Sequence, residues 1–236
     1  MASMDGGRNG GEAEGAVDDV ALRRDRRLLL VSSGLAIPEL LRHLLAGRQG
    51  LTMAFIPAAS YAEDYGVASR LSRWHWRALG LKVRVVDLTQ RHTWRVRAEL
   101  EECDLVYVCG GNSFYLMRCL RDSGAADAIR AMAARGVPYI GESAGAVVAA
   151  RDIGYIAPMD CNRALRGQAD PAGLGLTAYH VVPHVGGTML GRQARKILDR
   201  HAGDHGYVPL RNDQALQVTG TKARVITTYA LTPLAL

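Results

Sequence analysis

Short apolar segments alternate along this chain with stretches of helical length, and this alternation constrains the fold more than any other feature. The apolar segments lie at 27–34, 51–56, 82–86, 104–109 and 137–140. Helices are predicted between and after them, at 38–45, 62–79, 93–102, from 114 onward and at 125–135. Buried parallel strands are near-continuous apolar runs, and the helices that connect them cover both faces of the sheet. We therefore predict an α/β fold of three layers, with a doubly wound, mostly parallel sheet between helices.

The two ends of the chain differ in character from its centre. Residues 1–25 are Gly-rich and charged and have almost nothing to bury, which is typical of a disordered leader. In the final third, Val181-Val182 is a short apolar pair, a helix is predicted at about 190–201, and 214–229 has the pattern of two strands around Gly220. We expect a C-terminal β-hairpin there, and a single domain over 26–236.

Composition and charge argue against several functional classes. The net charge is +6, but the arginines that supply it are scattered in ones and twos apart from a cluster at 23–27, which is typical of a solvated surface. The four cysteines lack zinc-ligand spacing, and no apolar run has the length of a membrane span. No signal-peptide pattern is recognised in 1–19. We therefore predict a cytoplasmic protein that binds no nucleic acid, membrane or metal.

The segment Gly141-Glu-Ser-Ala-Gly145 is the most informative motif of the sequence. It follows a predicted strand and precedes the apolar helical run 146–150, which is the setting of a Gly-x-Ser-x-Gly nucleophile elbow. Such a turn lifts the serine hydroxyl above the carboxyl edge of the sheet, where ligands bind in open α/β folds. The pattern predicts Ser143 as a nucleophile, with the backbone N–H of Ala144 positioned to stabilise an oxyanion.

A second glycine break, Gly110-Gly111-Asn112, also lies between a strand and a helix. In a doubly wound sheet this loop opens at the same edge as the elbow. The N–H of Gly111 is therefore a candidate second oxyanion donor, since acyl transfer usually uses a pair. A plain strand-to-helix turn is the alternative.

A serine nucleophile needs a base, and His184 is the best placed of the seven histidines. It follows the apolar pair at 181–182 and lies between Pro183 and Gly186, which indicates a rigid loop at the carboxyl end of a strand. A structural histidine is the alternative. A carboxylate should orient the imidazole, and the sequence spacing leaves three candidates open between Ser143 and His184, namely Asp152, Asp160 and Asp170.

Three segments resemble the signature blocks of the peptidase E (aspartyl dipeptidase) family. They are Gly110-Gly-Asn-Ser-Phe-Tyr-Leu116, Gly141-Glu-Ser-Ala-Gly-Ala146 and Val182-Pro-His184, and their order and separations agree with the family. The similarity runs from roughly Leu28 to Ile226. That family resembles the class I glutamine amidotransferases in fold, with Ser in place of their nucleophilic Cys, so the resemblance implies a class I glutamine amidotransferase-like fold here.

The resemblance also implies a Ser-His-Asp triad and neither a metal nor an organic cofactor. It places the nucleophile at Ser143, the base at His184 and the acid at Asp160, with the amides of Gly111 and Ala144 as oxyanion donors. The best-known members of the family cut dipeptides with an N-terminal Asp. The related cyanophycinases cut a β-Asp-Arg polymer.

Three further residues are expected at the substrate: Asn112, Glu142 and Arg192. Glu142 stands where the dipeptidases usually carry Trp, and its carboxylate would repel an acidic substrate or bind a substrate amine. Arg192, with Arg195 one helical turn further on, lies about where the dipeptidases place an Arg that would bind a substrate carboxylate.

These features together predict a serine peptidase that hydrolyses small peptides through an acyl-enzyme, with dipeptides that begin with Asp as candidate substrates. We expect a monomer or a homodimer. A cyanophycinase-like amidase or an esterase with the same triad is the alternative within enzymes. A catalytically silent binding module is the alternative outside them.

Overall fold

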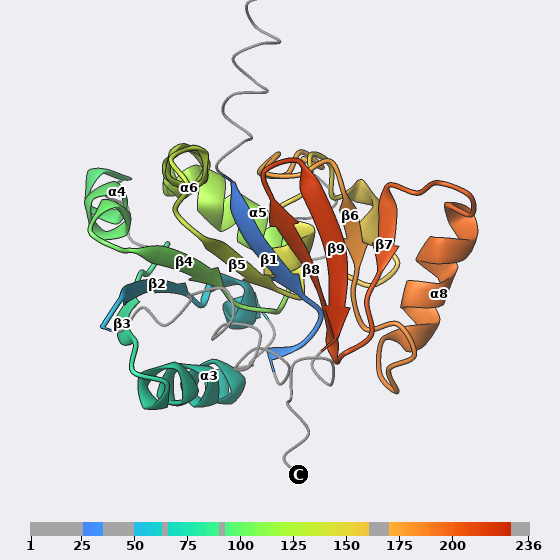
Figure 1. Cartoon of the computed structure of the whole chain (residues 1–236), viewed down its shortest axis with the longest axis horizontal. Coiled ribbons are helices and arrows are strands. Elements are labelled where there is room, and N and C mark those ends of the chain that lie inside the picture. Colours follow the sequence, from blue (N-terminus) through green and yellow to red (C-terminus); the bar gives the residue numbers. More distant parts are fainter. Residues whose placement is uncertain (1–25, 35–49, 63–65, 90–92, 161–169, 228–236) are drawn as a thin grey trace, which may run out of the picture.

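The computed structural model describes residues 26–34, 50–62, 66–89, 93–160 and 170–227, and its centre is a seven-stranded sheet (Figure 1). The strand order is β3-β2-β4-β5-β1-β8-β9. The first five are parallel, and their bounds are β1 Arg27–Val31, β2 Thr52–Ile56, β3 Lys82–Val85, β4 Leu105–Val108 and β5 Tyr139–Glu142. β8 (Gln214–Thr219) pairs antiparallel with β1, and β9 (Lys222–Thr227) pairs antiparallel with β8. The predicted α/β fold with a C-terminal hairpin is confirmed.

The strands β1, β2 and β4 are buried at almost every position because both faces of the sheet are covered there. In β1, Leu28 and Leu30 pack into one hydrophobic cluster, whereas Leu29 and Val31 pack into another on the opposite face. Successive side chains of a strand point to opposite faces. A strand buried on both sides must therefore be apolar at every position, and this is why the sequence pattern showed runs and no alternation.

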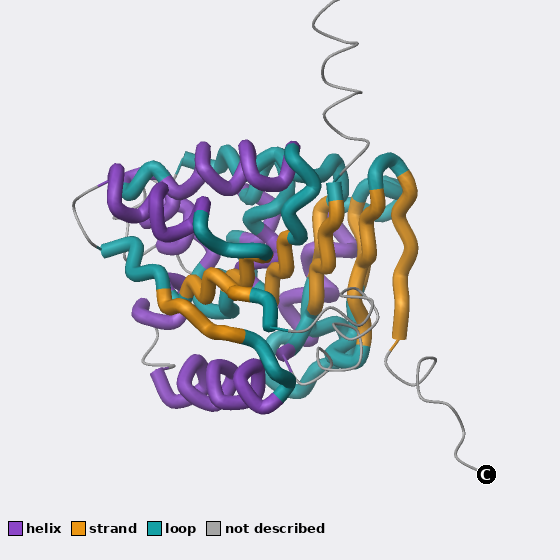
Figure 2. The backbone as a smooth tube through the Cα atoms, turned by 60° about the vertical axis from the view of Figure 1, so that its left-hand side comes forward, coloured by secondary structure: helices purple, strands orange, loops and turns teal. Residues whose placement is uncertain are grey.

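Helices lie on both sides of this sheet (Figures 1 and 2). α3 (Gly66–Ala78) covers one face and buries Trp76 against Tyr107 of β4. α4 (Thr93–Glu101), α5 (Ser113–Asp122) and α6 (Ala125–Ala134) cover the other. Their apolar side chains belong to the larger cluster, so the elements that carry the glycine loops are anchored in a continuous core.

A second, two-stranded parallel sheet lies beside the main one and is formed by β6 (His180–Val182) and β7 (Tyr207–Pro209). α8 (Gly191–Arg200) packs against it through Ala194 and Ile197. The sequence predicted β6 and α8 but missed β7. The reason is that β7 has only three residues and ends in Pro209, which leaves no apolar run to recognise.

The shorter elements are η2 (Ala58–Ala62), α7 (Ala144–Val147) and η3 (Gly154–Ile156). Two predictions, the leader at 1–25 and the helix at 38–45, lie outside the described residues. Within the described residues, no helix combines the length and apolar character needed to cross a bilayer. Cys103, Cys109 and Cys119 are free thiols and buried.

Candidate active site

Ser143 occupies a strained turn between β5 and α7. Its φ is 48° and its ψ is −107°, a region that residues with a side chain rarely adopt. The strand before it ends at Glu142 and the helix after it begins at Ala144. Gly145 lets this helix pass close to β4, since a Cβ there would lie 2.3 Å from the carbonyl oxygen of Val108. The predicted nucleophile elbow is therefore present in its strand–turn–helix setting.

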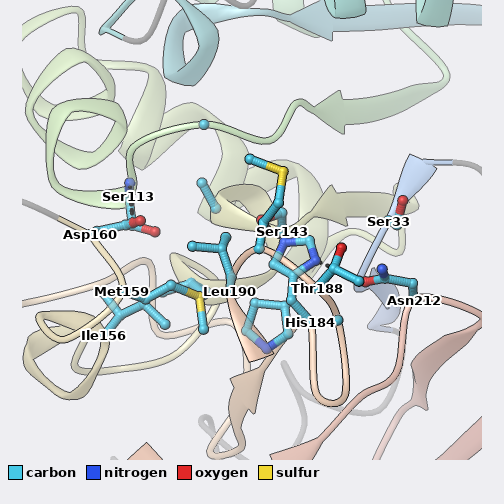
Figure 3. Close-up of a pocket in the computed structure, with 16 residues that line it drawn as sticks. Ser33, Ser113, Ser143, Ile156, Met159, Asp160, His184, Thr188, Leu190 and Asn212 are labelled. Carbon is cyan, nitrogen blue, oxygen red and sulfur yellow. Dashed lines mark hydrogen bonds between the residues drawn. The ribbon is translucent and has the colours of Figure 1, made fainter. Parts of the chain in front are cut away.

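His184 follows β6, and its side chain contacts Ser143 in the elbow. Its Nε2 atom lies 2.9 Å from the Oγ atom of Ser143 (Figure 3). His184 also has a positive φ, of 63°, and among the described residues only Ser143 and His184 combine a positive φ with a side chain. Strained backbone of this kind is stored where the surrounding structure fixes a functional geometry. Here the two strained residues are the ones in contact.

The other ring nitrogen of His184 is held by Asn212. The Nδ1 atom lies 2.9 Å from Oδ1 of Asn212, which is in the turn before β8. Because β8 runs antiparallel to β1, the start of β8 lies at the same edge of the sheet as the end of β1. An amide oxygen can only accept a hydrogen bond, so Nδ1 carries the proton and Nε2 presents its lone pair to Ser143.

Ser32, directly after β1, joins these groups into a closed network. Its hydroxyl oxygen accepts a hydrogen bond from the backbone N–H of His184 at 2.8 Å. The hydroxyl proton in turn is donated to Oδ1 of Asn212 at 3.3 Å. Ser32 is fully buried. The Ser32 hydroxyl donates a hydrogen bond, and only the oxygen of the Asn212 amide can accept it. Ser32 therefore fixes the amide with its oxygen, and not its NH₂ group, facing His184.

Asp160 does not take the position predicted for it. Its Oδ2 atom accepts a hydrogen bond of 2.7 Å from the backbone N–H of Ser113, the first residue of α5. Figure 3 shows Asp160 and Asn212 on opposite sides of the Ser143–His184 pair. Asp160 follows η3, and this short helix leads it to the amino end of α5, away from Nδ1 of His184.

The two predicted oxyanion amides lie at the same pocket as Ser143. Gly111 has a φ of 136°, and a Cβ at this position would lie 2.2 Å from the carbonyl oxygen of Ala59, so only glycine fits the loop. Ala144 is the first residue of α7, where backbone N–H groups have no partner within the helix. Both residues line the pocket.

The pocket at Ser143 has a volume of about 450 Å³, the size of a small-molecule site. Its wall is apolar at Val147, Ile156, Met159 and Leu190. Asp160 is the one carboxylate in this wall, and no Lys or Arg is among the described residues that form it. The described residues also contain no group of three or more His, Cys, Asp or Glu side chains that could hold a metal ion.

The three residues expected at the substrate lie outside this wall. Asn112 is buried and caps α5, where its Oδ1 accepts from the N–H of Tyr115. Arg192 is exposed on α8. The carboxylate of Glu142 accepts hydrogen bonds from the N–H of Gly34 and from the hydroxyl of Tyr107. Glu142 therefore joins the elbow to the end of β1 and to β4.

Sequence reasoning missed Asn212 and Ser32. It sought only carboxylates, and only between Ser143 and His184 in chain order. A usable signal was present, since Asn212 lies two residues before a predicted strand and Ser32 lies near the end of another. Pairing these two strands antiparallel would have brought both residues to the edge of the sheet that carries Ser143.

Comparison with known proteins gives consistent matches over nearly the whole described chain. A model of the family described as Peptidase family S51 matches residues 28–226. Uncharacterized peptidase Lmo0363 of Listeria monocytogenes is 31% identical over 195 residues, which are 83% of this chain and 95% of that protein. Peptidase E of Haemophilus influenzae is 29% identical over 69% of this chain and 71% of its own length. A crystal structure from Listeria monocytogenes EGD-e, described as a candidate peptidase E, has a TM-score of 0.80 at 29% identity, covering 86% of this chain and 98% of that one.

Proposed function

Since the chain belongs to peptidase family S51 and is a serine peptidase, we propose that it hydrolyses small peptides with Ser143 as the nucleophile and His184 as its base. Asn212 orients the imidazole, and the amides of Gly111 and Ala144 bind the oxyanion. The observation that carries this proposal is the 2.9 Å contact between Ser143 Oγ and His184 Nε2. A nucleophile within hydrogen-bond reach of an oriented base is the signature of covalent acyl transfer.

In the first half of the reaction, Nε2 of His184 takes the hydroxyl proton as Oγ of Ser143 attacks the peptide carbonyl carbon. The carbonyl oxygen becomes an oxyanion, which the N–H groups of Gly111 and Ala144 stabilise. The imidazolium then gives its proton to the leaving amine as the C–N bond breaks. The products of this half are the free amine and an ester of Ser143.

In the second half, a water molecule takes the place of the departed amine. His184 accepts a proton from this water as its oxygen attacks the ester carbonyl, and the same amides stabilise the second oxyanion. Collapse of this intermediate returns the proton to Oγ of Ser143. The carboxylic acid product leaves, and the site is restored.

A fluorophosphonate probe tests the proposal, because it phosphonylates only a serine that a base activates. We expect stoichiometric labelling of the wild-type protein, with mass spectrometry placing the adduct on Ser143, and no adduct on Ser143→Ala. Absence of labelling in the folded wild type would favour the catalytically silent binding module.

A dipeptide panel identifies the substrate among the alternatives. It comprises Asp-Gly, Leu-Gly, Arg-Gly, β-Asp-Arg and an ester of Leu. Cleavage of β-Asp-Arg alone would support the cyanophycinase-like amidase, and cleavage of the ester alone would support the esterase. The family resemblance leads us to expect a preference for Asp-Gly, whose side-chain carboxylate would need a cation to bind it. The described pocket wall contains no Lys or Arg, and Arg192 lies outside it.

Replacing Ser32 with alanine is expected to lower kcat/KM for the best dipeptide by about 10-fold to 100-fold. The hydroxyl is what selects the oxygen of the Asn212 amide. Without it the amide is free to turn its NH₂ toward Nδ1, which would place the imidazole proton on Nε2 and block the base. Steady-state kinetics measure the effect, and Ser32→Thr, which keeps a hydroxyl, serves as the matched variant. Equal kinetics of Ser32→Ala and wild type would remove Ser32 from the network.

A further inference from the structure

We propose that Asp160 binds a substrate ammonium group, so that the enzyme selects peptides with a free amino terminus and an uncharged first side chain. This inference rests on the proposed function, because it names the substrate class of the same pocket. In this assignment Asp160 binds the substrate and does not orient the imidazole of His184.

The carboxylate of Asp160 is firmly positioned but only half satisfied. Its Oδ2 atom is held by the N–H of Ser113 at 2.7 Å, whereas Oδ1 has no hydrogen-bond partner among the described residues. The hydroxyl of Ser113 is buried beside it. That oxygen meets no partner with hydrogen-bond geometry among the described residues, although it lies close enough to lower the pKa of the Asp160 carboxyl. Both residues line the pocket that contains Ser143. Two polar groups without full partners thus face one ligand site.

Keeping this carboxylate ionised without a cation is unfavourable. Burial raises the pKa of Asp160 above its usual range, although the nearby hydroxyl and the N–H of Ser113, and a positive charge on His184, act in the opposite direction. By surface area the Asp160 side chain is only half-buried, so its unpaired oxygen is exposed to the pocket and accessible to a ligand. The described wall of the pocket provides no Lys or Arg for this purpose. A positively charged ligand would supply the missing partner.

The rest of the wall indicates which cationic ligand fits. Ile156 and Met159 precede Asp160 on the same segment and, with Leu190, line the pocket that contains the Ser143–His184 pair. Figure 3 shows Leu190 between Asp160 and this pair. These side chains suit an uncharged substrate side chain and offer nothing to a carboxylate. Every unblocked peptide carries an α-ammonium group next to its first side chain and first carbonyl. An α-ammonium on Asp160 would therefore direct the enzyme to the first peptide bond, as in a dipeptidase or aminopeptidase.

A pair of peptides that differ only in the ammonium group tests this assignment: Leu-Gly and N-acetyl-Leu-Gly. We expect the wild type to prefer Leu-Gly in kcat/KM, and Asp160→Asn to reduce that preference by about 100-fold, mainly through KM. The asparagine keeps an oxygen for the N–H of Ser113 and removes only the charge. N-acetyl-Lys-Gly tests the other source of an ammonium, since its cleavage by wild type and loss in Asp160→Asn would place a Lys side chain on Asp160.

The rate of phosphonylation of Ser143 separates binding from catalysis, because a fluorophosphonate carries no ammonium group. Asp160→Asn is expected to lower kcat/KM for Leu-Gly much more than it lowers the rate of phosphonylation. The two fold-losses should differ by about 30-fold or more. Equal losses in both assays would overturn the proposal, and so would no loss in either. A wild type that fails to react with the probe would instead overturn the proposed function.

Two controls exclude indirect effects. Asp152→Asn removes the same charge from an exposed position outside the pocket wall, and its kinetics on Leu-Gly should equal those of the wild type. Thermal unfolding checks the fold of Asp160→Asn. Because the folded-state pKa of Asp160 is raised, ionisation destabilises the folded protein as pH rises through that pKa. The variant is therefore expected to be no less stable than wild type at neutral pH.

Discussion

Ser143→Ala is expected to lower kcat/KM for the best dipeptide by about 10⁴-fold or more, with the fold unchanged. In the proposed mechanism the hydroxyl is the attacking group, and no other described hydroxyl is hydrogen-bonded to the imidazole of His184. The backbone of the elbow does not depend on that hydroxyl. The N–H of Ser143 donates to the carbonyl of Val31 at 2.9 Å, and the close contacts at Gly141 and Gly145 do not involve the Ser143 hydroxyl. The residual rate would come from the oxyanion amides and from substrate binding.

Steady-state assays at high enzyme concentration measure this loss, and Ser123→Ala is its matched control. The hydroxyl of Ser123 donates to the carbonyl of Cys119 at the end of α5, away from the pocket. That variant should keep wild-type kinetics and lose about 1 kcal/mol of stability. Activity of Ser143→Ala within tenfold of wild type would contradict the nucleophile assignment.

The position of Ser143 could be predicted from the sequence because it depends on neighbouring residues. The strand, the turn and the helix that create it all lie within 139–147, and their glycines and apolar residues are visible in the motif. The same holds for the positions of the parallel strands along the chain, where each predicted apolar segment overlaps a strand. Short-range patterns decide these features, so no tertiary information was needed.

The partner of His184 could not be predicted in the same way, because it depends on pairing between the two ends of the chain. Ser32 and Asn212 are 180 residues apart and are brought together by the β1–β8 ladder. Asp160 had the right charge and a suitable place in chain order. In the structure, however, its carboxylate accepts a hydrogen bond from the N–H of Ser113 at the amino end of α5 and not from Nδ1 of His184. Chain order alone does not distinguish a carboxylate beside the imidazole from one across the pocket.

Glu142 illustrates a different limit. Its place beside the nucleophile suggested a role in specificity, yet both of its oxygens accept hydrogen bonds from the protein itself. The hydroxyl of Tyr107 is fully buried, and burial followed by the charge of Glu142 raises the pKa of this tyrosine well above its usual range, so Tyr107 remains a donor. Glu142 thus holds the elbow against β1 and β4. Both oxygens of this carboxylate are held by the protein itself, and Glu142 lies outside the described pocket wall, so these contacts give it a structural role.

Asn212→Ala is expected to lower kcat by about 10²-fold to 10³-fold, with a smaller change in KM. Asn212 makes no bond to Ser143 and acts through His184, so it is a positioning residue. Its Oδ1 holds the proton on Nδ1 and aims Nε2 at Ser143. Without it, the imidazole can take the unproductive tautomer and rotate away from the nucleophile.

Asn212→Asp distinguishes positioning from a purely structural role. A carboxylate also accepts from Nδ1, and its charge stabilises the imidazolium, so this variant should recover most of the activity that Asn212→Ala loses. Recovery of activity in Asn212→Asp beside a loss in Asn212→Ala would assign the effect to the hydrogen bond at Nδ1. A loss in Asn212→Asp as large as that of Asn212→Ala would show that Asn212 does not act through the imidazole.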